Sequence, residues 1–206
     1  QSGPDGRLGD KMKVLVHGPT AMLSAEKLIG EHAELIDARY GDIWIRDTGP
    51  VFYSNDCCAL FTFHGWGGKY VLEYDDQVGA FIAIEAGADA TRWDRVLEGG
   101  AVDWDGEGTI LTTKECLLNP NRNPLMSAAD VKTMLHDALG SRTTIWIDRG
   151  LLNDHTDGHV DNIARFLSPG VVACQSAADA DDPNAARLDE IAAQLENQRD
   201  ARGRLL

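Results

Sequence analysis

The chain has 206 residues, of which 43% are hydrophobic and 25% are charged, a composition typical of a soluble globular protein with one hydrophobic core. Its 33 acidic and 19 basic residues give a formal net charge of −14. We therefore expect no nucleic-acid partner, because a nucleic-acid-binding face is basic. The acidic surplus favours solubility, and attraction of a small cationic substrate is the alternative explanation. The sequence holds no run of about 18 apolar residues and no apolar leader, so we expect no membrane span.

The cysteine pattern indicates a reducing compartment. Cys57, Cys58, Cys116 and Cys174 have neither the spacing of a zinc ribbon nor that of a redox CxxC pair. We therefore expect reduced thiols in a cytoplasmic protein.

Apolar periodicity and turn residues predict alternating strands and helices. In the first half they predict strands at 12–17, from 35 and at 95–97, helices at 20–32 and 76–88, and a hairpin of 51–53 with 59–63. In the second half they predict hairpins of 101–104 with 109–113 and of 164–167 with 171–174, strands at 144–147 and from 200, and helices at 127–139 and from 182 to about 199.

These strand-hairpin-helix units recur every 50–60 residues or so, roughly the period of repeated supersecondary units. Each unit ends a strand at a polar cluster, at 42–47, 98–100 and 154–161. Repeats that each direct one polar cluster the same way predict a radial arrangement around a shared site.

The first polar cluster, residues 41–50, suits a planar cation. Asp42, Trp44 and Arg46 share one side of an extended strand, with Asp47 at its end. A carboxylate can accept paired hydrogen bonds from such a cation while an indole ring covers one of its faces. The structural alternative is a salt bridge between Arg46 and an aspartate, with Trp44 in the core.

The other two clusters add a histidine and further carboxylates. Glu98 precedes two glycines, which let the backbone approach a ligand closely or simply form a turn. In the segment 154–162, His159 and Asp161 are two residues apart and face one side of an extended strand, as a general acid/base pair would. The alternatives are a metal site built from His155, His159 and the neighbouring aspartates, and a purely structural cluster.

Two more segments have open interpretations. We interpret the loop 119–124, which is rich in Asn and Pro, as a structural rim or interface, because Asn side chains satisfy turn backbone. Trp66, within 64–68, is either a pocket wall or part of the core.

Five motifs occur in the order in which agmatine deiminases and bacterial peptidylarginine deiminases carry them, and the chain resembles this family over roughly residues 36–190. The motifs are GDIWIRDTGP at 41–50, GWGGK at 65–69, LEGG at 97–100, LNPNRNP at 118–124 and TDGHVDN at 156–162. The resemblance implies an α/β fold that is part of a five-bladed pentein propeller. It further implies about three of the five ββαβ-type repeats in a single incomplete domain over 1–206, with neither a metal nor an organic cofactor.

The resemblance also implies residue roles. Asp47 and Asp161 would each grip one edge of a guanidinium, and His159 would act as general acid/base. Glu98 would lie in the same site, on the substrate or supporting His159. To the substrate-binding set we add Trp44, Trp66 and Asp157.

The implied reaction is hydrolysis of an arginine-derived guanidine by way of a cysteine thiouronium intermediate, with agmatine giving N-carbamoylputrescine and ammonia. A peptidyl-arginine deiminase and a non-catalytic guanidinium-binding protein are the alternatives.

The sequence departs from the family in its nucleophile. The Gly-rich segment that ends in the catalytic cysteine is absent, and none of the four cysteines stands in that context. We therefore expect a fragment that also lacks the opening strand and helix, and that shows no deiminase turnover. Open strand edges would favour a homo-oligomer. His155 replaces an acidic residue of the relatives, which leaves the choice of guanidine substrate open.

Overall fold

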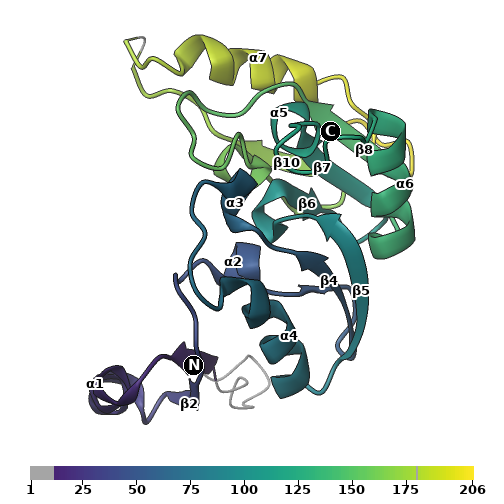
Figure 1. Cartoon of the computed structure of the whole chain (residues 1–206). Helices are drawn as coiled ribbons and strands as arrows, with labels where there is room; N and C mark the ends of the chain where they lie inside the picture. Colours follow the sequence, from purple (N-terminus) through teal and green to yellow (C-terminus); the bar gives the residue numbers. More distant parts are fainter. Residues whose placement is uncertain (1–11, 180) are drawn as a thin grey trace, which may run out of the picture.

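The computed structural model describes residues 12–179 and 181–206, and Figure 1 shows four small sheets that follow one another along the chain. The first eleven residues of the domain expected over 1–206 lie outside the described part.

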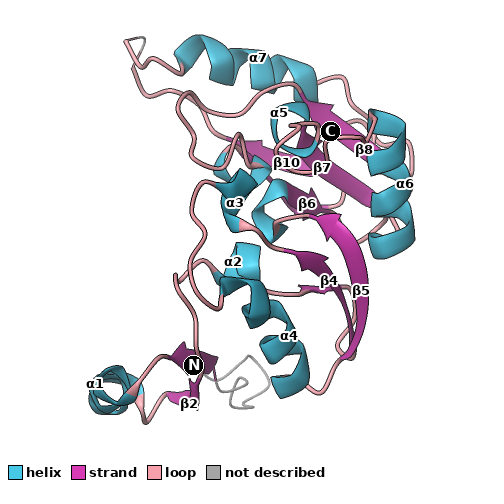
Figure 2. Cartoon of the chain, in the orientation of Figure 1, coloured by secondary structure: helices cyan, strands magenta, loops and turns pink. Residues whose placement is uncertain are grey.

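Two successive units share one topology. In the first, β3 (Val51–Phe52) and β4 (Cys57–Thr62) form an antiparallel hairpin, α4 (Asp75–Glu85) follows, and β5 (Asp89–Val96) returns parallel to β4. The second repeats this with β6 (Val102–Trp104), β7 (Thr109–Thr113), α6 (Ala128–Leu139) and β8 (Thr143–Ile147), as Figure 2 shows. The predicted repeat is thus a ββαβ unit.

The flanking units contain parts of the same pattern. At the start, β1 (Met12–Val16) pairs in parallel with β2 (Ala33–Asp37) across α1 (Pro19–Ile29). At the other end, β9 (Ala164–Ser168) and β10 (Val171–Cys174) form an antiparallel hairpin followed by α7 (Ala185–Leu195). Of the expected strand from 200, the described residues form one isolated bridge, between Arg199 and Leu205.

The apolar core lies between each sheet and its helix. One cluster packs β6, β7 and the short helix α5 (Lys114–Leu117) against Val131 and Leu135 of α6. A second packs β8 and the start of β9 against Leu188 and Ile191 of α7. Among the described residues, no helix is both long enough and apolar enough to cross a membrane.

Three segments that the sequence analysis treated as extended or as loops form short helical turns. These are α2 (Ile45–Thr48), α3 (Gly65–Gly68) and the 3-10 turn η2 (Val160–Asn162), while a further 3-10 turn, η1 (Gly99–Ala101), follows Glu98. In α2 the backbone N–H groups of Asp47 and Thr48 both donate to the carbonyl of Trp44, which an extended strand would not allow. The strand parity expected for Asp42, Trp44 and Arg46, and for His159 and Asp161, was therefore wrong.

Helix α6 begins where its sequence predicts. The Ser127 hydroxyl accepts a hydrogen bond from the backbone N–H of Asp130, whose carboxylate accepts in return from the backbone N–H of Ser127, so a capping box is complete. Gly140 ends the helix in the left-handed conformation, with φ of 70°.

Removing the cap should destabilise the fold without touching the polar clusters. We expect Ser127→Ala to lower the free energy of unfolding by about 1 kcal/mol, because the substitution leaves an N-terminal helical N–H without its partner. Urea denaturation followed by circular dichroism measures this change. Lys132→Ala, an exposed substitution within the same helix, is the control and should leave the unfolding midpoint almost unchanged.

Candidate functional site

A cavity of about 490 Å³ lies where three segments meet, and its lining combines aromatic and acidic side chains. The segments are the approach to α2 with α2 itself, α3 with the residues that follow it, and the loop that leads into η2. The lining residues are Asp42, Trp44, Arg46, Asp47, Trp66, Tyr70, Asp154, His155, Thr156, His159, Asp161 and Asn162. Carboxylates beside aromatic faces suit a cation.

Asp47 is held in one orientation by two donors. The backbone N–H of Gly100 donates to Oδ1 at 2.8 Å, and the indole Nε1 of Trp66 donates to Oδ2 at 3.0 Å. Each carboxylate oxygen can accept more than one hydrogen bond, so Asp47 retains acceptor capacity toward the cavity.

The surroundings of Gly100 and Gly99 explain why two glycines follow Glu98. A Cβ atom at Gly100 would lie 2.6 Å from Asp47 Oδ1 and from His159 Nδ1, and 2.8 Å from Asp161 Oδ2. Three side chains from two separate segments, α2 and the start of η2, therefore converge on the space that this glycine leaves free. At Gly99 a Cβ would collide with the backbone carbonyl of Arg46.

His159 is buried between two carboxylates. Its Nδ1 is 3.6 Å from Asp47 Oδ1, and its Nε2 is 3.9 Å from Glu98 Oε2. Nε2 has no hydrogen-bond partner among the described residues, and the backbone N–H donates to Thr156 Oγ1 at 3.0 Å. An imidazole between two carboxylates is suited to take up and release a proton.

The two aspartates on the η2 side have opposite electrostatic environments. Burial, and then the charge of Asp47, hold the pKa of Asp161 above its ordinary value. The pKa of Asp154 is lowered: burial opposes this, but hydrogen bonds from the backbone and hydroxyl of Thr156 and from Asn162 outweigh burial. A cation bound beside Asp161 would relieve the cost of its ionisation.

Glu98 and Asp157 lie outside the cavity lining, and both are bound to Arg122. The guanidinium Nε of Arg122 is 2.9 Å from Glu98 Oε1, and Nη1 is 2.6 Å from Asp157 Oδ2. Lys69 and Asn121 also donate to Asp157. Asp157, which the sequence analysis placed among the substrate-binding residues, thus has its oxygens occupied behind the cavity wall.

Arg122 is the residue of this network that the sequence analysis missed. The loop 119–124 was interpreted as a rim or interface, but the structure buries the Arg122 side chain completely behind His159 and Glu98. The available signal was a single arginine in an otherwise uncharged loop.

No cysteine lines the cavity. Cys116 is buried in α5 within the core cluster, and burial, followed by the charge of Glu98, raises its pKa well above the ordinary value. Its thiol therefore stays protonated and is a poor nucleophile. Cys58 is buried, Cys57 is half-buried and Cys174 is exposed on β10.

The described residues bring together one group of three potential metal ligands, Glu98, Cys116 and His159, with ligand atoms within 4.8 Å of one another. Glu98 is already paired with Arg122 and Cys116 holds its proton, so this donor set suits a metal poorly. His155, the ligand on which the metal alternative depended, is not in the group, and its Nδ1 is 2.7 Å from the hydroxyl of Tyr70.

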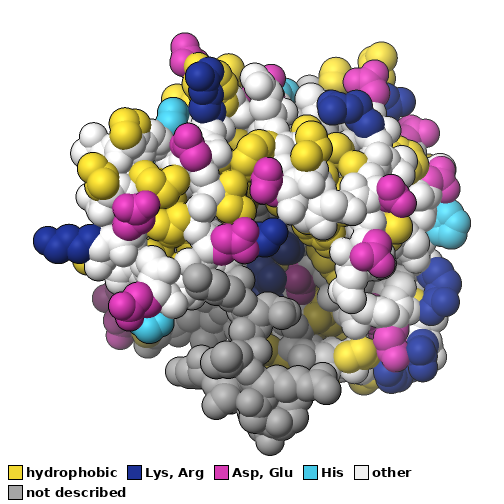
Figure 3. Space-filling view, turned by 90° about the horizontal axis from the view of Figure 1, so that it is seen from below, with side chains coloured by type: hydrophobic (Ala, Val, Ile, Leu, Met, Phe, Trp, Pro, Cys, Tyr) yellow, Lys and Arg dark blue, Asp and Glu magenta, His cyan; other side chains and the backbone are white. Residues whose placement is uncertain are grey.

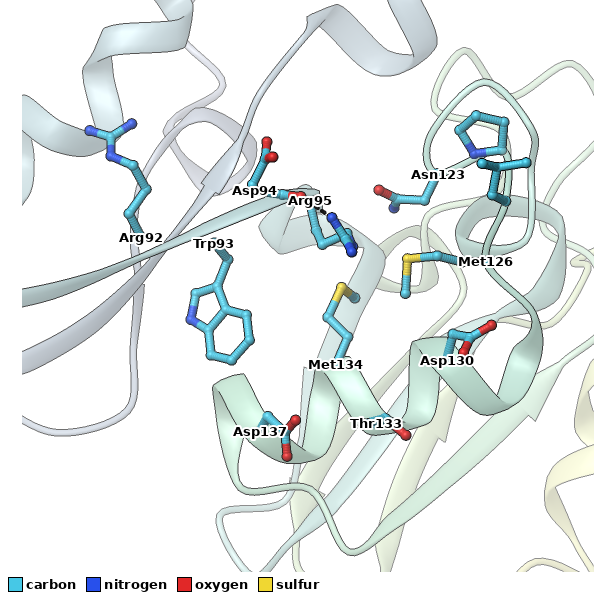
Figure 4. Close-up of a pocket in the computed structure, with 12 residues that line it drawn as sticks. Arg92, Trp93, Asp94, Arg95, Asn123, Met126, Asp130, Thr133, Met134 and Asp137 are labelled. Carbon is cyan, nitrogen blue, oxygen red and sulfur yellow. Dashed lines mark hydrogen bonds between the residues drawn. The ribbon is translucent and has the colours of Figure 1, made fainter.

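A larger groove, of about 800 Å³, lies between β5 and α6 and is far less suited to a small cation. Figure 4 shows Trp93 on the opposite side of β5 from Arg92 and Asp94, with Met134 of α6 across the groove. Its lining mixes basic with acidic side chains and contains no histidine.

The acidic surplus is spread over the surface. Figure 3 shows acidic side chains at many points of the face seen from below, including the edge of a hollow that also holds basic side chains. Such a distribution attracts cations over a distance, whereas the cavity supplies the specific contacts.

Repeated ββαβ units with carboxylates and a histidine converging between them define the pentein class of α/β propellers, of which this chain contains a part. A family model described as Porphyromonas-type peptidyl-arginine deiminase matches residues 8–206. The chain belongs to this family.

Known relatives agree with this assignment. The agmatine deiminase of Stutzerimonas stutzeri (strain A1501) is 43% identical over 204 residues, which cover 91% of this chain and 55% of the relative. The agmatine deiminase of Pseudomonas aeruginosa (strain LESB58) is 42% identical over 182 residues, covering 84% of this chain and 50% of the relative. The chain thus spans about half the length of these relatives.

Solved structures show the same fold. An agmatine deiminase of Enterococcus faecalis superposes with a TM-score of 0.88 at 32% identity, covering 95% of this chain and 56% of that one. An agmatine deiminase of C. jejuni with substrate bound gives a TM-score of 0.79 at 30% identity, covering 89% of this chain and 56% of that one.

The indole of Trp66 should contribute to ligand binding through Asp47. We expect Trp66→Phe to weaken the binding of a cation in this cavity about tenfold or more, because a hydrogen bond to a charged carboxylate contributes about 1.5–3 kcal/mol. Isothermal titration calorimetry measures the affinity. Trp146→Phe is the matched control, since the Nε1 of Trp146 has no partner among the described residues and its loss should leave the affinity unchanged.

Proposed function

We propose that this chain is the guanidinium-binding half of a C–N hydrolase that converts agmatine to N-carbamoylputrescine and ammonia. The observation that supports this proposal is the convergence of Asp47, His159 and Asp161 on the space beside Gly100. The names of the relatives and of the similar structures favour agmatine as the substrate.

The proposed cradle suits a guanidinium because that group is planar and stays protonated at any working pH. Asp47 and Asp161 would accept charge-assisted hydrogen bonds from its edges, while Trp44 and Trp66 would cover its faces. Binding would also favour the ionised form of Asp161, whose pKa is raised in the free protein.

The proposed chemistry uses His159 as general acid and base. A thiolate attacks the guanidinium carbon and forms a C–S bond, and His159 donates a proton to the departing nitrogen, which leaves as ammonia. Water then attacks the thiouronium carbon, His159 takes up a proton, and the sulfur leaves to give the carbamoyl product. Glu98, behind His159, would hold the imidazole in place. The thiolate would come from a segment outside these 206 residues.

The far end of the substrate would meet the mouth of the cavity. Tyr70 and His155 contact each other there, ring edge to ring face, with centroids 5.9 Å apart. Peptidyl-arginine is the second candidate substrate, since the family description names it. The proposal also places the protein in the cytoplasm, where its four free thiols would stay reduced, and allows for self-association.

Binding of agmatine should depend on the ionisation of Asp161. We expect tight binding above the pKa of Asp161 and weaker binding as the pH falls through that pKa, which lies above the ordinary aspartate value of about 4. Calorimetric titrations between pH 4 and 8 or so measure this dependence. Putrescine, which lacks the guanidinium, should bind far more weakly than agmatine.

Asp161→Asn should bind agmatine weakly at every pH and lose this pH dependence. Asp189→Asn, an exposed change on α7, is the control and should behave as the unaltered chain does. Equal affinity for agmatine and putrescine would contradict the proposed cradle.

The chain by itself should release no ammonia from agmatine, because none of its cysteines lines the cavity. A coupled ammonia assay at saturating agmatine measures turnover. Cys116→Ser should change nothing in this assay, and measurable release that Cys116→Ser abolishes would show that the assignment of Cys116 as an inert thiol is wrong.

A further inference from the structure

Arg122 is a buried cation that lies behind the cavity lining. Its side chain has no exposed surface, and its guanidinium is 2.9 Å from Glu98 Oε1 and 2.6 Å from Asp157 Oδ2. Nη2 donates to the backbone carbonyl of Thr156 at 2.8 Å, and Nη1 donates to the side chain of Asn121 at 2.9 Å.

Two of these partners lead directly to His159. Glu98 is fully buried and its Oε2 is 3.9 Å from His159 Nε2. Thr156, whose carbonyl accepts from Arg122, uses its hydroxyl to accept from the backbone N–H of His159. Arg122 therefore contacts Glu98, which lies beside the imidazole of His159, and Thr156, which binds the backbone N–H of His159.

The remaining contacts join the loop 119–124 to the wall of the cavity. Lys69 and Asn121 bind the same carboxylate of Asp157 as Arg122 does. His64 Nε2 lies 2.8 Å from the backbone carbonyl of Asn121. A Cβ atom at Gly67 would lie 2.3 Å from Nδ2 of Asn121 and 2.6 Å from Nη1 of Arg122, and Gly67 has a φ of 81°, so both the network and the backbone favour glycine there.

We propose that Arg122 is a positioning residue, which clamps Glu98 to the loop 154–159 and so fixes His159 at the cavity. This inference rests on the proposed function, because it assigns Arg122 a role in guanidine binding and catalysis by His159. Arg122 itself is outside the cavity lining.

A charged clamp is required because Glu98 is a buried carboxylate. Burial alone would lower the pKa of Arg122, but Glu98 and Asp157 hold it above its ordinary value, so the guanidinium stays charged. A neutral residue at 122 would leave the buried carboxylate of Glu98 without its arginine partner and release the Thr156 carbonyl. Lysine would keep the charge but lose the planar fork that joins these four partners.

A double-mutant cycle on agmatine affinity tests this role. We expect Arg122→Gln to weaken binding at least about tenfold, since breaking a buried charge pair has large effects. In a Glu98→Gln background, Arg122→Gln should weaken agmatine binding little further, because position 98 then has no carboxylate that needs a cationic partner. Arg187→Gln is the matched control: Arg187 also binds a backbone carbonyl, that of Gly150, and its loss should leave the affinity unchanged.

Hydrogen exchange supplies a readout that needs no ligand. We expect Arg122→Gln to speed exchange of the His159 amide while β7 and β8 keep their protection, and Arg122→Lys to give an intermediate result. Unchanged affinity and unchanged exchange at His159 in folded Arg122→Gln would overturn the proposal. If Arg122→Gln fails to fold, Glu98→Gln and Glu98→Gln/Arg122→Gln take its place, and a further tenfold loss in the double variant would overturn it.

The two proposals can fail separately. If the unaltered chain binds no agmatine but Arg122→Gln speeds hydrogen exchange of the His159 amide, the proposed guanidine function is wrong and the positioning role of Arg122 is supported. If the unaltered chain binds agmatine and Arg122→Gln lowers only the thermal stability, the residue is merely structural and the positioning role is wrong.

Discussion

The site depends on carboxylates that are held close together and only partly neutralised. Asp47 is fixed by Gly100 and Trp66, and its charge adds to the burial that raises the pKa of Asp161. Two carboxylates beside one imidazole are unfavourable without a cation. The cavity therefore favours a positive ligand, and the fold must supply the energy that keeps these groups in place.

The protein applies the same chemistry twice. Behind the cavity, Glu98 and Asp157 hold the guanidinium of Arg122, and in the proposed function Asp47 and Asp161 would hold the guanidinium of the substrate in front. The internal pair is neutralised by Arg122, so it can act as a rigid support, whereas the outer pair is the one proposed to bind the cation of the substrate. His159 lies between the two arrangements, which suits a group that must be steady and still exchange protons.

Local signals predicted much of the fold. The capping box of α6 and the hairpins follow from residues a few positions apart, so their sequence patterns were sufficient. The turn α2 was not predicted, because Trp44 and Asp47 were assigned to a strand on parity alone. The role of Arg122 was invisible because its partners Glu98 and Asp157 lie 24 and 35 residues away in the chain. The convergence of the site residues was expected from the repeats, but their exact neighbours were not.

Two strained turns carry the network. Trp66 and Asp157 adopt left-handed backbone conformations, with φ of 51° and 62°, which cost about 1–3 kcal/mol for residues other than glycine. Each has a side chain that the network requires, because Trp66 donates to Asp47 and Asp157 accepts from Arg122. Glycine would relax either turn but remove the donor or the acceptor. The strain is therefore tolerated because the hydrogen bonds that it makes possible fix the carboxylates around His159.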